Sequence, residues 1–160
     1  MEDNKLKEFI DGYETHTTSD IYTNIISEFG DINIILDTRS KILQIKTPAG
    51  SILKNLNSWI NKNIYDFLTI ESKEKLNFHL TSLSDLSKSS TKWFELNHIS
   101  ENTGEFPVKY KGFKAVNKKN VILIGNDLSL VAEIQKKFVN SQLALEREYS
   151  KYRSFETKYK

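Results

Sequence analysis

Five short segments of the sequence have the apolar pattern and flanking turn residues of β-strands, and they fall into a group of two and a group of three. The segments are INIILD (32–37), KILQIK (41–46), WFELNHIS (93–100), EFPVKYKGFKAV (105–116) and NVILIGND (120–127). Turn-forming residues separate the strands within each group, at 37–40, 101–104 and 117–120. This order predicts two sets of antiparallel hairpins. Val108, Tyr110 and the VILI run at 121–124 are the predicted core residues.

The residues between the two groups have a helical character. Residues 48–68 contain only short apolar pieces, which predict short helices and turns. Thr69 then precedes an amphipathic stretch with Glu71 in its first turn, and Leu76, Leu80 and Leu83 form its apolar face. An α+β fold follows, with one five-stranded antiparallel sheet and its helices on one face. The order of the strands across the sheet is not fixed by the pattern.

The two ends of the chain predict further helices. Residues 1–30 are acidic, and Ile21, Ile25, Ile26 and Phe29 recur at helical spacing, which favours an N-terminal helical cap that stops at Gly30. Residues 128–160 contain neither Gly nor Pro and predict one long helix, capped by Asn126 or Asp127. The predicted organisation is a leader over 1–30, a domain over 31–127 and a helix over 128–160.

The long helix has an apolar heptad row, which is the pattern of a coiled coil. The row consists of Val131, Phe138, Leu145, Tyr152 and Tyr159, and its companion row of Ile134, Ser141, Glu148 and Phe155 is half polar. A helix of about 32 residues spans roughly 48 Å, more than a domain of this size can cover. We therefore expect a homodimer through Val131, Ile134, Phe138, Leu145 and Tyr152. The alternative is that Leu128, Val131 and Ile134 pack on the sheet and the remainder is a solvated linker.

Composition excludes several functions. The chain has 160 residues, no cysteine and a net charge of +2. Thiol switches, thiolate metal sites and cysteinyl photo-adducts are therefore excluded within it, and no direct nucleic-acid binding is expected.

We expect no membrane span, since no apolar run approaches 20 residues. The acidic start MEDNKLKEF has no signal-peptide core, so a cytoplasmic protein is expected. Neither a nucleophile elbow nor a phosphate loop occurs, so we expect no enzyme.

The three histidines are weak candidates for a cofactor site. His16 falls in a polar loop, His79 on the helix after Thr69, and His98 on a strand. None has zinc-ligand spacing to another, so no metal site is expected. For His98 the favoured interpretation is a sheet histidine with a neighbouring hydrogen-bond partner. Six aromatic residues could line an apolar pocket, although a filled core is favoured; they are Trp59, Tyr65, Phe67, Phe78, Tyr110 and Phe113.

Two strands, a helical insert, three strands and a C-terminal helix resemble a PAS domain with its signalling helix. The resemblance sharpens in TIESKEKLNFHL (69–80), WFELNHIS (93–100), GEFPVKYKGF (104–113) and the tail from IGNDL, which includes Gln135, Gln142, EREY (146–149), Arg153 and ETKY (156–159). These stretches are similar to the N-terminal PAS domain and glutamine-containing linker helix of the PpsR/CrtJ family, which are repressors of photosynthesis genes.

The resemblance implies a regulatory module for dimerisation and signal relay. Members of the family carry further PAS domains and a helix-turn-helix, neither of which is recognised in this chain, so we expect either a part of a longer regulator or a short relative. An antirepressor or another PAS protein is the partner that the resemblance implies. Haem has been proposed for the family and would require one of the three histidines here, with His79 and His98 as the weak candidates. A small-molecule sensor and a stand-alone adaptor remain the alternative functions.

Overall fold

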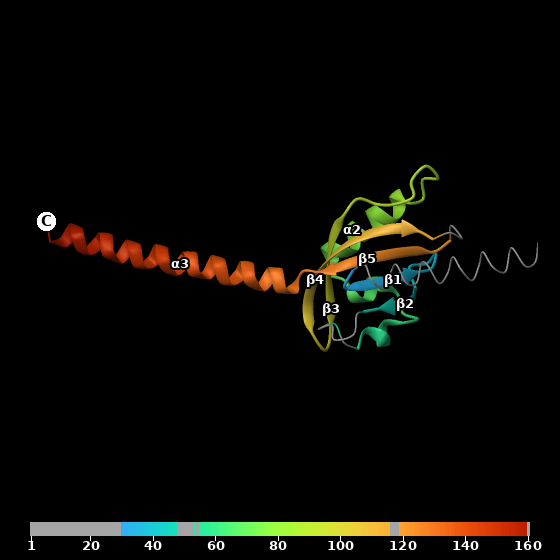
Figure 1. Cartoon of the computed structure of the whole chain (residues 1–160), viewed down its shortest axis with the longest axis horizontal. Coiled ribbons are helices and arrows are strands. Elements are labelled where there is room, and N and C mark those ends of the chain that lie inside the picture. Colours follow the sequence, from blue (N-terminus) through green and yellow to red (C-terminus); the bar gives the residue numbers. More distant parts are fainter. Residues whose placement is uncertain (1–29, 48–52, 54, 116–118, 160) are drawn as a thin grey trace, which may run out of the picture. The chain divides into compact units, whose positions relative to one another are not determined.

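The computed structural model describes residues 30–47, 53, 55–115 and 119–159 of the chain (Figure 1). The chain divides into two compact units, Met1–Asp127 and Leu128–Lys160, and each is described here by itself. The predicted N-terminal helical cap lies outside the described residues.

The first unit contains one five-stranded antiparallel sheet, as predicted. Its strands run in the order β2-β1-β5-β4-β3 (Figure 1). The bounds are β1 Ile32–Leu36, β2 Ile42–Lys46, β3 Phe94–Ser100, β4 Gly104–Lys114 and β5 Val121–Asp127. The predicted hairpins are confirmed, since β1 pairs with β2, β3 with β4, and β4 with β5. The pairing of β1 with β5 joins the two groups of strands.

The turn between β1 and β2 owes its shape to one aspartate. The Oδ1 atom of Asp37 accepts hydrogen bonds from the backbone amides of Arg39 and Lys41, each at 2.8 Å. Ser40 has a φ of 62°, in the left-handed region. In the turn, these two amides have the Asp37 side chain as their acceptor instead of the carbonyl of a neighbouring strand.

Between β2 and β3, the described residues form three helical segments. They are η1 Leu56–Trp59, η2 Ile64–Phe67 and α2 Ile70–Ser82. Thr69 caps α2 as predicted, since its side chain accepts a hydrogen bond from the amide of Ser72. The Ser72 hydroxyl in turn accepts from the amide of Asn97 at 2.8 Å, which ties the start of α2 to β3. Leu76 and Leu83 are buried, which confirms the predicted apolar face.

The core lies between the inner face of the sheet and these helices. Alternate residues of β3 and β4 point inward. Six residues of the sheet are fully buried, namely Ile32, Ile34, Leu96, Val108, Tyr110 and Leu123. The predicted VILI core is therefore wrong in part: Leu123 is buried, but Ile122 and Ile124 are partly exposed. Successive side chains of a strand point to opposite faces, so only every second residue of the run can reach the core.

The second unit is one helix, α3 Ser129–Lys158, of 30 residues. The predicted helix is confirmed, but its predicted cap is wrong. The N-cap is Leu128, which makes no side-chain capping bond. Asn126 and Asp127 belong to β5, where Lys109 and Val108 are their partners, so neither occupies the capping position. Among the described residues, no helix combines the length and the apolar character that a membrane span requires.

Gly125 provides a test of this packing. A Cβ atom at Gly125 would lie 2.5 Å from Cε1 of Tyr110 and 2.7 Å from Cγ1 of Val108. Gly125→Ala should therefore lower the free energy of unfolding by about 1–3 kcal/mol, because a well-packed core does not accept the added methyl without displacement. Urea unfolding measures this change.

The matched control is Asn126→Ala on the same strand, at an exposed position. It should change the free energy of unfolding by less than about 0.5 kcal/mol. Equal effects of the two variants would contradict the close contact between Gly125 and the Tyr110 ring.

Candidate functional site

His98 is the polar centre of the interior. It lies on β3, fully buried, with Nε2 2.8 Å from the Tyr110 hydroxyl and Nδ1 3.2 Å from the carbonyl oxygen of Phe67. A carbonyl can only accept, so Nδ1 carries the proton and donates to Phe67, while Nε2 accepts from Tyr110. Burial lowers the pKa of His98 to about 4, and its bond to Phe67 opposes this only in part. The ring is therefore neutral near pH 7.

Aromatic rings fill the space around His98. Trp59 and Phe106 lie with ring centroids 5.3 Å from the imidazole, and Trp59 stacks on Phe67 at 4.3 Å. Burial also raises the pKa of the Tyr110 hydroxyl well above its ordinary value, and the nearby Asp127 adds to this, so Tyr110 stays protonated.

An axial haem ligand needs a ring nitrogen with a free lone pair. Both nitrogens of His98 are engaged within the protein, so these residues do not fit haem as they stand.

His79 lies on α2 and is part of an aromatic stack. Its ring lies 4.0 Å from that of Phe94, nearly parallel, and meets the edge of Phe78 at 5.3 Å. Partial burial lowers the pKa of His79. His16 lies outside the described residues.

The six aromatic residues considered for an apolar pocket do not gather at one place. Trp59 and Tyr110 belong to the core, and Tyr65 and Phe67 pack against it. Phe78 is 71% exposed and cannot line an interior cavity. Phe113 alternates with the inward-facing Gly112 and lies beneath the Lys111 ammonium, which is 5.7 Å from its ring centroid.

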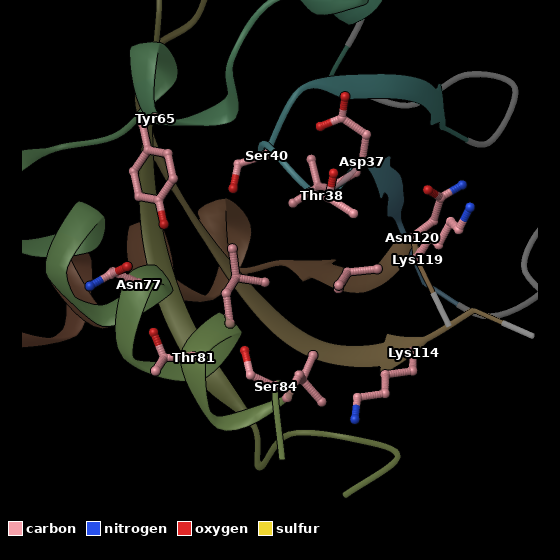
Figure 2. A pocket seen from close by; sticks show the side chains of 14 residues that line it. Asp37, Thr38, Ser40, Tyr65, Asn77, Thr81, Ser84, Lys114, Lys119 and Asn120 are labelled. Carbon is pink, nitrogen blue, oxygen red and sulfur yellow. The ribbon is translucent and has the colours of Figure 1, made fainter. Parts of the chain in front are cut away.

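A cavity of about 410 Å³ opens on the surface of the first unit (Figure 2). Its apolar lining comes from Leu36, Leu80, Leu83 and Val121. Its polar lining comes from the β1–β2 turn, η2, the end of α2 and the connection between β4 and β5; these residues are Asp37, Thr38, Ser40, Tyr65, Asn77, Thr81, Ser84, Lys114, Lys119 and Asn120. The sequence did not identify this cavity, whose walls come from four separate parts of the chain.

Hydrogen bonds fix the walls of this cavity. The backbone oxygen of Ser40 accepts a hydrogen bond from the amide of Ile64 at 3.0 Å. On the opposite wall, the Lys114 ammonium donates to the backbone oxygen of Asp85 at 2.6 Å. These two bonds tie the lining residues Ser40 and Lys114 to neighbouring segments of the chain.

The predicted dimer residues are all exposed on α3. Val131, Ile134, Phe138, Leu145 and Tyr152 are 48–68% exposed, and no residue of α3 is buried. The Ser141 hydroxyl, in the polar half of the companion row, donates to the backbone oxygen of Lys137 at 2.9 Å. Further exposed apolar residues lie off the predicted seam, namely Leu130, Val139, Leu143 and Tyr149. The opposite charges of Glu133 and Lys137 pair within the helix at 2.9 Å.

No group of three or more potential metal ligands comes together among the residues that the structure describes.

Tyr110→Phe tests the buried hydrogen bond. The change removes the donor to Nε2 of His98 and leaves a buried acceptor without a partner, so the free energy of unfolding should fall by about 1–3 kcal/mol. The control is Tyr149→Phe, at an exposed position of α3. A loss no larger than that of the control, measured by urea unfolding, would refute the buried bond.

His98 also predicts a pH dependence of stability. The unfolded chain takes up a proton on this histidine near pH 6.5, whereas the folded protein resists it down to about pH 4. The unfolded state therefore binds more protons between these values, and the free energy of unfolding should fall as the pH is lowered through this window, by roughly 3 kcal/mol.

His98→Gln isolates this contribution. The variant cannot titrate at this position, so its stability should fall less steeply between pH 6.5 and pH 4 than that of the parent. His79→Gln is the matched control and should keep most of the parent's slope. Identical slopes in the parent and His98→Gln would mean that His98 is not held neutral by burial.

No family model matches the chain. Protein CrtJ from Rhodobacter capsulatus is 26% identical to it over 142 residues, which cover 88% of this chain and 30% of that protein. The chain therefore spans about 30% of the length of the curated relative that it matches.

The fold resembles solved PAS domains. The PAS domain of an HTR-like protein from Haloarcula marismortui superposes with a TM-score of 0.50 and 16% identity, covering 70% of this chain and 98% of that chain. A PAS domain from Desulfitobacterium hafniense has a TM-score of 0.49 and 18% identity, over 66% of this chain and 99% of that one. The first likeness shows a shared fold and confirms the predicted PAS-like sheet of five antiparallel strands. The chain has a PAS fold, and most of its sequence fits a PAS domain of a CrtJ-like protein.

Proposed function

We propose that this chain is a regulatory PAS module that forms a homodimer through α3 and relays a signal to further domains of a CrtJ-like transcriptional repressor. The observation that carries the proposal is the 30-residue helix with its exposed apolar seam, in a chain with a PAS fold and similarity to CrtJ. DNA binding would belong to another part of the regulator. The module itself would be cytoplasmic and without enzymatic activity, and an antirepressor or another PAS protein would be its regulatory partner.

The energetics favour a weak and adjustable dimer. Full burial of an aliphatic or aromatic side chain contributes about 1.5–3 kcal/mol, and five seam residues are available for it. Association itself costs several kcal/mol, and the polar Ser141 and Glu148 interrupt the companion row. A seam of this kind lets a bound partner shift the balance between two states of association, because a modest difference in affinity is then sufficient.

The chain connects the domain to the helix through one residue. β5 ends at Asp127 and α3 begins at Ser129, so only Leu128 separates them. β5 pairs with both β1 and β4. The proposed relay therefore has a short covalent path, from β5 through Leu128 to α3.

Two substitutions in the seam test the dimer. Phe138→Glu together with Leu145→Glu introduces charge at successive positions of the heptad row, and the dimer should dissociate to a monomer in multi-angle light scattering. The control pair, Asn140→Glu with Ser150→Glu, adds the same charge off the seam and should leave the dimer intact.

Each outcome separates the proposal from its alternatives. A parent protein that is monomeric at all concentrations would contradict the homodimer and favour the adaptor. A dimer that survives both double variants would place the contact elsewhere than α3. A ligand of a few hundred daltons retained in native mass spectrometry would favour the sensor.

A further inference from the structure

The apolar surface of α3 does not follow the predicted heptad row along its whole length. Tyr149 is exposed, as are Phe138 and Leu145 of that row. It lies 18 residues after Val131, which is five full turns of a helix with about 3.6 residues per turn. The side chains of Val131 and Tyr149 therefore leave the helix on the same side, and Glu148 leaves it about 100° away.

A strict heptad row drifts around a straight helix by about 20° in each heptad. Tyr152, three heptads after Val131, therefore lies about 60° from it, whereas Tyr149 has returned to the same line. The apolar stripe of the straight helix thus contains Tyr149 in addition to the heptad residues Phe138 and Leu145.

Two parallel copies of α3 can pair in two ways, and the first is the heptad register. In that register Glu148 and Ser141 lie in the seam, each opposite the same residue of the second copy. Two glutamate carboxylates would then face each other in a layer that is partly removed from water, where like charges repel strongly. The Ser141 hydroxyl already donates to the backbone oxygen of Lys137 in its own helix.

The second way, the shifted register, puts Gln142 and Tyr149 in those two layers. Each is the residue that follows its heptad counterpart, so the seam gains an aromatic ring and a neutral amide. Glu148 then flanks the seam, opposite Arg153 of the second copy. Among the described residues, neither of these two charged side chains forms an ion pair within its own helix.

We infer that α3 binds α3 of a second copy in parallel through the shifted register, with Tyr149 in the seam and Glu148 paired to Arg153 of the second copy. The inference rests on the proposed dimer and names the residues by which the two copies recognise each other. Twofold symmetry gives two such ion pairs. The shift is confined to the middle of the helix, because its next position is Glu156 and the apolar row continues instead at Phe155.

Cysteine cross-linking of the full chain tests the register, since the chain contains no cysteine of its own. Leu145→Cys lies in the seam of both registers and should form a disulfide-linked dimer on mild oxidation. Tyr149→Cys should cross-link at a similar rate. Its neighbour Glu148→Cys should react at least about tenfold more slowly, because Cα atoms more than about 7 Å apart are not bridged without movement of the backbone.

Gln142→Cys and Ser141→Cys form a second matched pair, and the first should cross-link faster than the second. Fast reaction of Glu148→Cys and Ser141→Cys, with slow reaction of the other pair, would overturn the inference and leave the proposed dimer in the heptad register. Failure of Leu145→Cys to cross-link would overturn both the inference and a parallel dimer through α3.

Charge reversal tests the ion pair. Arg153→Glu should raise the dissociation constant of the dimer about threefold to tenfold in analytical ultracentrifugation, and Glu148→Arg combined with Arg153→Glu should restore it. Lys151→Glu is the matched control and should leave the dissociation constant unchanged. In the heptad register Lys151 would instead flank the seam opposite Glu156 of the second copy. A dimer weakened by Lys151→Glu and unaffected by Arg153→Glu would therefore overturn the inference.

Discussion

The contact of the Tyr110 ring with Gly125 determines much of this interior. Tyr110 lies on β4 directly opposite Gly125 of β5 and opposite Phe94 of β3. Because Gly125 has no side chain, the ring can lie against its backbone, and the hydroxyl then reaches Nε2 of His98. His98 in turn donates a hydrogen bond from Nδ1 to the carbonyl oxygen of Phe67, at the end of η2. One ring therefore joins three strands and a helix, and every buried polar atom in this chain of bonds has a partner.

Local signals in the sequence predicted most of the elements. Asp37 marked the first turn, Thr69 marked the start of α2, and alternation marked the strands, because each of these depends on residues close together in the chain. The adjacency of β1 and β5 was not predicted, since pairing between distant strands depends on the whole fold. The outward direction of Ile122 and Ile124 was also missed. A continuous apolar run does not reveal which of its residues face the core.

The functional residues were harder to predict than the fold. The sequence placed His98 on a strand, but its partner Tyr110 is set by the register of β3 and β4. No sequence motif marks the surface cavity, because its lining residues, such as Ser40, Thr81 and Lys114, are far apart in the sequence. The polar residues Asn77, Thr81 and Ser84, at helical spacing near the end of α2, were the one available signal, and they equally suit a solvated helix face.

The arrangement of the domain limits how a signal could reach α3. The interior around His98 is filled with packed rings, and such packing resists gradual deformation. The cavity instead includes Val121, the first residue of β5. The strand ends at Asp127, and only Leu128 lies between it and α3. Seven residues of β-strand span about 24 Å, and β5 is paired on both sides, with β1 and with β4. In the proposed relay, a ligand would change the association of α3 only if it bound two states of the domain with different affinity.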